Sequence, residues 1–390
     1  MTAVIVSGAL ANKPLNGGAA WTRLSWILGL KKLGLDVLFV EQIDDKACVN
    51  AEGQRTAFED SVNLAFFKQV TNQFGLSASA SLIHTEGEGL RTFGLGFGDL
   101  LDAASDAKLL VNITGHLKLE RLTSLIQRKL YIDLDPGFTQ FWQASGESGS
   151  VLEGHDFYFT VGENIGTPHC SIPTGGVRWR PVRQPVVLEH WPVSAEGDRD
   201  LFTTIASWRG AYGRVEHGGK TFGLKAHEFR KFIELPGRAE GQRFEIALDI
   251  HPAEVKDLEL LRSCGWRLIN PQRAVPDPHR FRRYVQNSGG EFSVAQGIYV
   301  ETGSGWFSDR TVRYLASGKP ALVQDTGFSC NYPTGSGLVA FRDLDEAVEG
   351  VEIIARDYEQ HCEAARTLAE EYFDSDKVLS RMLDEVGLTL

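Results

Sequence analysis

The start of the chain shows the apolar and polar spacing of a strand, a loop and a helix. Residues 3–8 are mostly β-branched or apolar, and a loop rich in Gly, Asn and Pro follows at 11–18. Residues 21–33 have helical spacing that ends before Gly34, and residues 36–41 form a second apolar run. Such a βαβ unit predicts a parallel sheet that is covered by helices.

The same alternation continues along the chain. In the first half it predicts further strands at 108–113, 129–134 and 156–161 and helices at 57–74 and 119–127. In the second half it predicts strands at 202–207, 244–250, 266–269, 291–300 and 320–323, with helices at 222–235, 252–264, 278–287, 309–317 and 344–372. This pattern is typical of an α/β protein built from two tandem units.

A less periodic segment, residues 171–192, contains four prolines and is interpreted as a connector. We therefore predict two Rossmann-like domains, residues 1–185 and 186–375, that face each other across a cleft. A C-terminal helix at 376–390 is expected to return to the first domain. Because ligands of such folds bind at the carboxyl ends of the strands, the cleft is the expected position of the active site.

Composition narrows the class of protein. The 390 residues include 51 acidic and 40 basic side chains, and the net charge of −11 argues against general nucleic-acid binding. The five cysteines are scattered without CxxC spacing, so neither a disulfide framework nor a zinc site is expected. The chain shows no signal-peptide pattern, and no run reaches the roughly 20 apolar residues of a membrane span. We expect a cytoplasmic protein, while the oligomeric state stays open.

The densest chemical signal lies between Glu301 and Gly327. The strand predicted at 291–300 would lead into a loop of small residues at 302–305, which includes Gly305. Ser308 is placed to cap a helix that begins at Asp309, and the free amides of a helix start attract phosphate. After that helix and a short strand, Asp325, Thr326 and Gly327 form a polar turn that is expected at the same cleft.

Residues 314–323, Tyr-Leu-Ala-Ser-Gly-Lys-Pro-Ala-Leu-Val, resemble the Ala-Met-Ala-x-Gly-x-Pro-Val-Val segment of GT-B glycosyltransferases of the group-1, family 4-like type. The resemblance extends over roughly residues 202–340 and is supported by the loop Asn16-Gly17-Gly18 before the first helix. It implies a GT-B fold in which the N-terminal domain receives an acceptor, not identified by the sequence, and the C-terminal domain binds a nucleotide diphosphate sugar. It also implies a reaction without metal or cofactor.

Two other readings of the same fold remain open. A nucleotide-sugar 2-epimerase would need the donor but no acceptor, and a non-catalytic sugar-nucleotide-binding protein would bind without turnover. Nothing in the sequence decides between retention and inversion, or names the base and sugar of the donor.

The sequence departs from the resembled family at one position. Where that family has the second Glu of its Glu-x7-Glu motif, this chain has Arg313. Glu301 and Asp309 are separated by seven residues and are the alternative carboxylates for the ribose or sugar hydroxyls. The alternative is that the Asp309 carboxylate binds no ligand and only stabilises the N-terminus of its helix through the helix dipole.

Basic partners for the diphosphate are expected after the first strand of the second domain. Arg209 and Lys220 flank a Gly-rich stretch there, and charge-assisted bonds to phosphate would order it. Solvated loop charges are the alternative. Lys225 is a weaker candidate because it falls inside a predicted helix. The turn Asp325-Thr326-Gly327 is predicted to line the sugar pocket.

The first half supplies the candidates for proton transfer. His116 follows the strand at 108–113, and Asp135 follows the strand at 129–134. Asn16, Gly17 and Gly18 would let the backbone approach a ligand closely. Alternatively, His116 is a structural histidine and Asp135 forms a turn before Pro136. The alternative for the Asn16-Gly17-Gly18 loop is a plain βα turn. Asp133-Leu-Asp135 has the Asp-x-Asp form of metal-dependent transferases, but its position in the acceptor half favours a metal-free interpretation.

Overall fold

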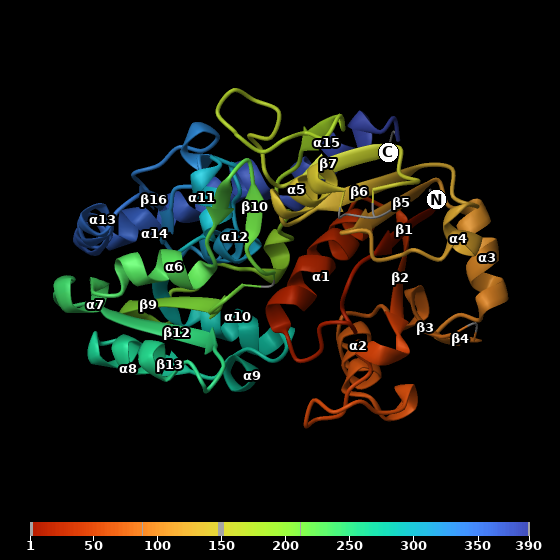
Figure 1. The fold of residues 1–390 in the computed structure, drawn as a ribbon, viewed down its shortest axis with the longest axis horizontal. Helices are drawn as coiled ribbons and strands as arrows, with labels where there is room; N and C mark the ends of the chain where they lie inside the picture. Colours follow the sequence, from red (N-terminus) through yellow and green to blue (C-terminus); the bar gives the residue numbers. More distant parts are fainter. Residues whose placement is uncertain (1–2, 88, 147–151, 211, 389–390) are drawn as a thin grey trace.

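The computed structural model describes residues 3–87, 89–146, 152–210 and 212–388. Two parallel sheets lie side by side, with helix α1 (Gly17–Lys32) between the two halves (Figure 1). The first sheet has the order β4-β3-β2-β1-β5-β6-β7-β8, and only the pairing of β3 with β4 is antiparallel. Its strands are β1 (Ala3–Ser7), β2 (Asp36–Asp44), β3 (Ala80–Glu86), β4 (Gly89–Phe93), β5 (Leu109–Ile113), β6 (Lys129–Asp133), β7 (Phe157–Thr160) and β8 (Trp179–Pro181).

The second sheet has the order β13-β12-β9-β14-β15-β16, and all its pairings are parallel. Its strands are β9 (Asp198–Ser207), β12 (Arg243–Asp249), β13 (Arg267–Ile269), β14 (Ser288–Ser293), β15 (Ala321–Gln324) and β16 (Leu338–Phe341). A separate antiparallel hairpin is formed by β10 (Val215–His217) and β11 (Lys220–Phe222).

Helices connect the strands of both sheets. In the first half they are α2 (Val62–Gln73), α3 (Phe97–Asp106), α4 (Glu120–Thr123) and α5 (Phe138–Ser145). In the second half they are α6 (Lys225–Phe229), α7 (Leu235–Arg238), α8 (Val255–Ser263), α9 (Pro271–Ala274), α10 (Pro278–Gln286), α11 (Gly297–Glu301), α12 (Asp309–Ala316), α13 (Leu344–Arg356), α14 (Tyr358–Leu368), a π-helical turn (Ala369–Phe373) and α15 (Ser375–Glu385). Short 3₁₀ turns lie at Asp45–Ala47, Phe58–Asp60, Ser77–Ser79, Leu188–His190, Arg230–Phe232 and Phe328–Cys330.

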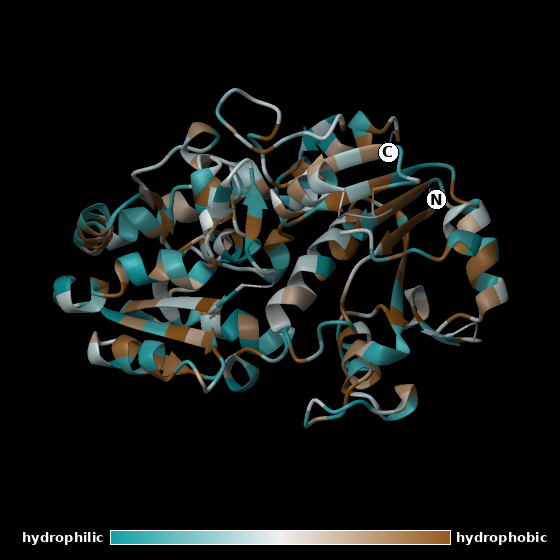
Figure 2. Cartoon of the chain, in the orientation of Figure 1, coloured by the Kyte–Doolittle hydropathy of each residue, from teal (hydrophilic) through white to brown (hydrophobic). Residues whose placement is uncertain are grey.

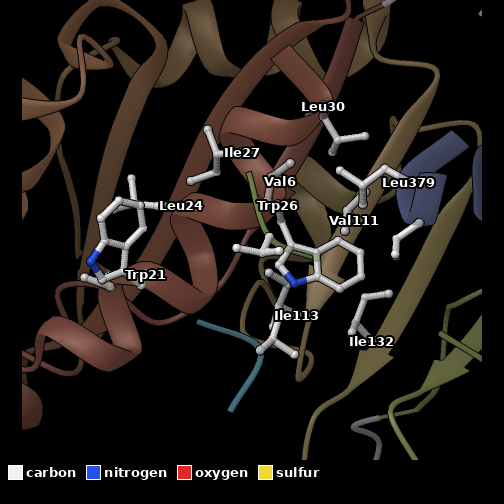
Figure 3. Packing of buried hydrophobic residues seen from close by; sticks show 14 of the residues in the cluster. Val6, Trp21, Leu24, Trp26, Ile27, Leu30, Val111, Ile113, Ile132 and Leu379 are labelled. Carbon is white, nitrogen blue, oxygen red and sulfur yellow. The ribbon is translucent and has the colours of Figure 1, made fainter. Parts of the chain in front are cut away.

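The core of the first half lies under α1. Trp26 is fully buried and packs over Val6, Val111 and Ile132 of the sheet (Figure 3). The helix shows almost no amphipathic segregation because helices cover it on several sides. In Figure 2 hydrophilic residues concentrate on the outer faces of the peripheral helices. Burying large side chains such as this tryptophan contributes a few kcal/mol each.

Helix α15 lies against α1, although it follows the whole second half of the chain. Gly29 permits the contact, because a Cβ atom there would lie 2.5 Å from Leu379 Cδ1 and 3.0 Å from Ser375 Cβ. The last helix therefore packs on the first one. The predicted domain limits at 185/186 and 375/376 stay predictions.

One predicted element is partly wrong in kind, and another begins at a different residue. The strand predicted at 291–300 ends at Ser293, and α11 follows it, so the loop at 302–305 leaves a helix. A short apolar run does not distinguish a buried strand from a buried helix. The helix predicted at 222–235 begins only at Lys225, since Gly218 and Gly219 have φ of 58° and 76° and close a hairpin turn.

Candidate functional site

A cavity of about 300 Å³ lies between the carboxyl ends of the two sheets. Its lining is rich in charge and comes from both halves of the chain. Loops after β1, β5 and β6 and helix α1 form one wall, and α12 with the end of β9 forms the other. The charged lining residues are Lys13, Arg23, Asp135, Asp309, Arg310 and Arg313. Cavities at this position in α/β folds bind ligands.

Two smaller cavities adjoin the first. One, of about 210 Å³, is lined by Lys225, Ser308 and Gly210 on the side of the second sheet. The other, of about 170 Å³, is mostly aromatic and is lined by Trp142. The Asp135 side chain borders all three cavities. This carboxylate therefore lies at the junction of every space a substrate could occupy here.

The Asp135 carboxylate accepts hydrogen bonds from two tyrosines of the second half. Tyr299 Oη donates to Oδ1 over 3.2 Å, and Tyr212 Oη donates to Oδ2 over 3.3 Å. Burial raises the pKa of Asp135, while the nearby Lys13 cation acts in the opposite direction. A half-buried carboxyl with a raised pKa suits proton transfer near neutral pH.

The neighbouring Asp133 has a structural environment. Burial raises its pKa to about 6, and its oxygens accept bonds from Gln140 and Thr160, each over 2.8 Å, and from Thr139. These bonds fix the end of β6 and the start of α5. Of the Asp-x-Asp pair, Asp133 thus lines the 170 Å³ cavity, whereas Asp135 lines all three cavities.

Asp309 connects the two walls. Its Oδ2 accepts from Thr22 Oγ1 of α1 over 2.6 Å and from Arg313 Nη1 over 2.5 Å. Burial acts to raise the pKa of Asp309, but the Arg313 charge and these bonds outweigh it, so the pKa lies below its usual value. Arg313, which the resemblance places at the second Glu of the Glu-x7-Glu motif, is in this structure the partner of Asp309.

Arg310 and Lys225 bring positive charge to the second wall. Arg310 is anchored on three sides: Nε donates to Glu291 over 2.5 Å, Nη1 to the Ile205 carbonyl and Nη2 to Ser293 Oγ. Among the described residues, no hydrogen bond or ion pair holds the Lys225 ammonium. Burial and the Arg310 charge lower the pKa of Lys225 to about 7, although Glu291 opposes this.

His116 lines the first wall as predicted from its place after β5. Burial and the charges of Arg23 and Lys13 lower its pKa to about 3, so the ring is neutral at physiological pH and is a weak base. Thr114, two residues earlier, has φ of 55°, a strained conformation for a β-branched residue. These observations favour Asp135 over His116 as a proton acceptor, and the role of His116 stays a prediction.

The Asn16-Gly17-Gly18 loop has mixed roles. Asn16 caps α1 by accepting from the Ala19 amide over 2.9 Å, and both Asn16 and Gly18 line the cavity. At Gly17 a Cβ atom would lie 2.3 Å from the Asp277 carbonyl oxygen. Gly17 therefore allows α1 to approach the start of α10, which explains this glycine by packing.

Arg209 and Lys220, the predicted partners of the diphosphate, each contact a carboxylate in this structure. Arg209 bonds to Glu254 at the surface, and Lys220 on β11 pairs with Glu301 over 2.9 Å. Each side chain thus has its own carboxylate partner outside the three cavities. The predicted donor contacts of these three residues, Arg209, Lys220 and Glu301, stay predictions.

The small-residue loop and the polar turn pack against each other. Asn164 Nδ2 donates to the carbonyls of Gly303 and Gly327, and a Cβ atom on Gly305 would lie 2.7 Å from the Asn164 side chain. Thr326 Oγ1 donates to the Trp306 carbonyl over 2.6 Å. The predicted ligand roles of Gly305, Thr326 and Gly327 stay untested, since their visible contacts are within the protein.

Asp325 and Ser308 end up in different environments. The Asp325 carboxylate accepts from the Gly327 amide, Ser329 Oγ and Arg342, and its side chain is 7% exposed. These bonds hold the turn after β15. Ser308 is the N-cap of α12, as predicted, because its Oγ accepts from the Arg310 amide over 3.2 Å, and it lines the cavity beside Lys225.

Sequence reasoning missed several lining residues. Lys13, Arg23, Tyr212 and Trp306 carry no motif, and they lie together only because the two halves meet. Lys225 had one usable signal: it begins the first helix after the first strand of the second sheet, a position where a cation faces the cleft.

Neither a protein-family model nor a curated relative matches the chain. Solved structures do match it over nearly its whole length. An alpha-glucosyltransferase in complex with UDP and a 13-mer DNA has a TM-score of 0.61 at 12% identity, covering 99% of each chain. HepE of Anabaena in complex with UDP-glucose gives 0.59 at 10% identity, covering 99% of this chain and 100% of HepE. Sucrose-phosphate synthase from Thermosynechococcus elongatus gives 0.54 at 11% identity, covering 99% and 98%.

The chain has the GT-B fold. The finer family 4-like assignment stays a prediction. Among the residues that the structure describes, none of the helices combines the length and apolar character that crossing a bilayer requires. Within the same residues, no three metal-binding side chains gather into a group that could hold a metal ion.

Proposed function

We propose that this GT-B protein is a glycosyltransferase that moves a sugar from a nucleotide diphosphate sugar to an acceptor held by the first half of the chain. The observation that carries the proposal is the Lys225 ammonium, held by no hydrogen bond or ion pair among the described residues, in a cavity that also borders Ser308 and Asp135. This lysine is half-buried and its pKa is lowered to about 7, so an anionic ligand in the cavity would favour its charged form. The likeness to structures that hold UDP or UDP-glucose supports the proposal.

In the proposed reaction, protein groups stabilise the charge that grows on the leaving diphosphate. The free amides at the start of α12 and the anchored Arg310 guanidinium are fixed dipoles and charges beside the cavity. Since Glu291 already compensates Arg310, Lys225 supplies the additional positive charge. This assignment needs no metal ion.

Asp135 is the proposed acceptor of the proton from the attacking hydroxyl. The hydroxyl oxygen would form the new bond to the sugar carbon, the bond from that carbon to the diphosphate would break, and the proton would pass to the carboxylate. Trp306, whose ring centroid lies 4.5 Å from that of Tyr299, borders the 300 and 210 Å³ cavities and presents an apolar wall for a sugar.

A ligand screen tests this proposal. We expect one class of UDP, GDP, ADP or TDP sugar to raise the thermal midpoint of the protein, because a ligand bound only by the native state stabilises it. Lys225→Gln should lose most of that shift, whereas Lys46→Gln, at an exposed position in the first half, should keep it. Release of nucleoside diphosphate that depends on an added acceptor would establish transfer. An absence of any shift across the panel contradicts the proposal.

A further inference from the structure

The first wall of the cleft carries positive charge that the proposed donor site does not use. Lys13, in the loop after β1, and Arg23, on α1, both line the 300 Å³ cavity. Each cation lowers the pKa of the neighbouring His116, so the two charges act on the same small region. Arg23 also lowers the pKa of Lys13.

Arg23 is buried and forms no ion pair with a carboxylate of the described residues. The residue is 6% exposed, and within the same residues its hydrogen bonding is limited to that from Nη1 to the Ala19 carbonyl over 3.3 Å. Its Nε atom is buried and has no hydrogen-bond partner among the described residues. An arginine stays charged at every physiological pH, and leaving such a charge without a partner destabilises a protein.

The acids around Arg23 are engaged elsewhere. Glu41 accepts from the Ala11 and Asn12 amides over 2.7 and 2.9 Å. Asp309 is held by Arg313, and Asp135 accepts from two tyrosines. These acids favour the charged guanidinium through space, but neither it nor the Lys13 ammonium forms an ion pair within the described part of the chain, so both charges are available to an anion in the cavity.

The cations of the second wall lie apart from those of the first, so the cleft has two separate positions for an anion. There Arg310 is bonded to Glu291, and Lys225 faces the smaller cavity beside Ser308. The two cavities share Asp135, Trp306 and Asp309, so the cations of the two walls lie on either side of the proposed transfer point.

We infer that Lys13 and Arg23 bind an anionic group, phosphate or carboxylate, on the acceptor. The inference rests on the proposed function, because the second wall is then taken by the donor diphosphate. A cavity of about 300 Å³ is at the small end of ligand sites, which fits a small hydroxylated molecule that bears one such group. The hydroxyl of this acceptor would contact Asp135, and its anionic group would bind Arg23. The guanidinium suits both oxyanions, since its N–H groups match their geometry.

The test uses inorganic phosphate as the probe on the full chain. Phosphate is titrated by calorimetry into the free protein and into protein saturated with UDP, or with GDP, ADP or TDP where one of these binds better. We expect phosphate to bind in the presence of the nucleotide. Arg23→Gln and Lys13→Gln should each weaken phosphate binding about 10-fold or more, the effect of losing a bond to a charged group.

Matched variants separate this inference from the proposed function. Arg23→Gln and Lys13→Gln should leave nucleotide affinity within about 3-fold, whereas Lys225→Gln should weaken the nucleotide and spare phosphate. Lys118→Gln changes an exposed lysine near His116 that does not line the cavity, and it should change neither affinity. Arg23→Gln should also raise the thermal midpoint of the free protein, which shows that the variant folds.

Three outcomes would overturn the inference or its basis. Equal loss of nucleotide affinity in Arg23→Gln and Lys225→Gln would assign both walls to the donor. Phosphate binding that is unchanged in both first-wall variants would show that these cations hold no anion. If no nucleotide binds, the proposed function fails, and the phosphate titration of the free protein still decides whether Lys13 and Arg23 form an anion site.

Discussion

Thr22 and Asp309 join the two halves of the molecule across the cleft: Thr22 Oγ1 on α1 donates to Asp309 Oδ2 at the start of α12 over 2.6 Å. The same carboxylate holds Arg313, which is 2% exposed. Asp309 thus has two structural functions. It compensates a buried cation, and it positions α1 relative to α12.

These functions separate by mutation. Thr22→Val removes one hydrogen bond and should lower the free energy of unfolding by about 1 kcal/mol. Asp309→Asn leaves Arg313 buried without a carboxylate and should cost about 3 kcal/mol. Urea unfolding of both variants measures the difference. Equal losses would show that the interaction with Arg313 contributes little.

Lys225 makes nucleotide binding dependent on pH. Its pKa of about 7 means that the ammonium loses its proton as the pH rises through 7, whereas a bound diphosphate favours the charged form and raises that pKa. We expect nucleotide binding at pH 8 to take up close to one proton, and binding at pH 6 to take up very little. Calorimetry in buffers of different ionisation enthalpy measures the uptake, and Lys225→Gln should abolish it.

Asp135 and His116 differ in their expected effects on turnover. Asp135→Asn should lower kcat by roughly 10² to 10⁴ while changing donor affinity little. Because activity needs the ionised carboxylate, it should fall as the pH drops through the raised pKa of Asp135. His116→Asn should show a smaller effect and keep that acid limb. A parental rate in Asp135→Asn would remove this residue from the proton-transfer step.

Turnover should persist in the presence of a chelator. The charge on the leaving group is assigned to Lys225, Arg310 and the start of α12, so EDTA is expected to leave the rate within about 2-fold, a margin well below the effect of a single charge-assisted bond. Loss of activity with rescue by Mn²⁺ or Mg²⁺ would contradict this and would make Asp133 and Asp135 candidate ligands.

Gly17 should tolerate no side chain. In Gly17→Ala the new methyl group would lie 2.3 Å from the Asp277 carbonyl, and the resulting displacement of α1 should cost about 1 to 3 kcal/mol. Gly98→Ala is the control, because it lies in α3 with no atom within 4 Å of its Cβ position and should stabilise by up to about 1 kcal/mol. Thermal midpoints of the two variants should therefore move in opposite directions.

Sequence periodicity was sufficient for the fold class because most strands of both sheets are parallel and buried, although β3 and the antiparallel edge strand β4 were not predicted. The strands that continue as apolar runs, such as β1 and β5, were placed within a residue or two. Periodicity failed at 294–301, where the apolar run is too short to distinguish a helix from a strand. The helix predicted at 222–235 starts three residues later, at Lys225, because β11 of the hairpin extends to Phe222.

The candidate site was harder to predict for a different reason. Asp135 and His116 follow strands, and the carboxyl ends of parallel strands meet at one edge, so their positions could be foreseen. Whether Arg209 or Lys225 faces the cavity depends on which cation finds a carboxylate nearby. Glu254 engages Arg209, and that contact is 45 residues distant in sequence. Local spacing holds no information about such pairs.

The contact of α15 with α1 has a consequence for co-translational folding. The first half of the chain leaves the ribosome before the second, and the helix that covers Gly29 is translated only after the strands of both sheets. Until then the face of α1 that α15 covers stays open to solvent or to a chaperone. A chain truncated before Ser375 would therefore leave this face of the N-terminal half uncovered.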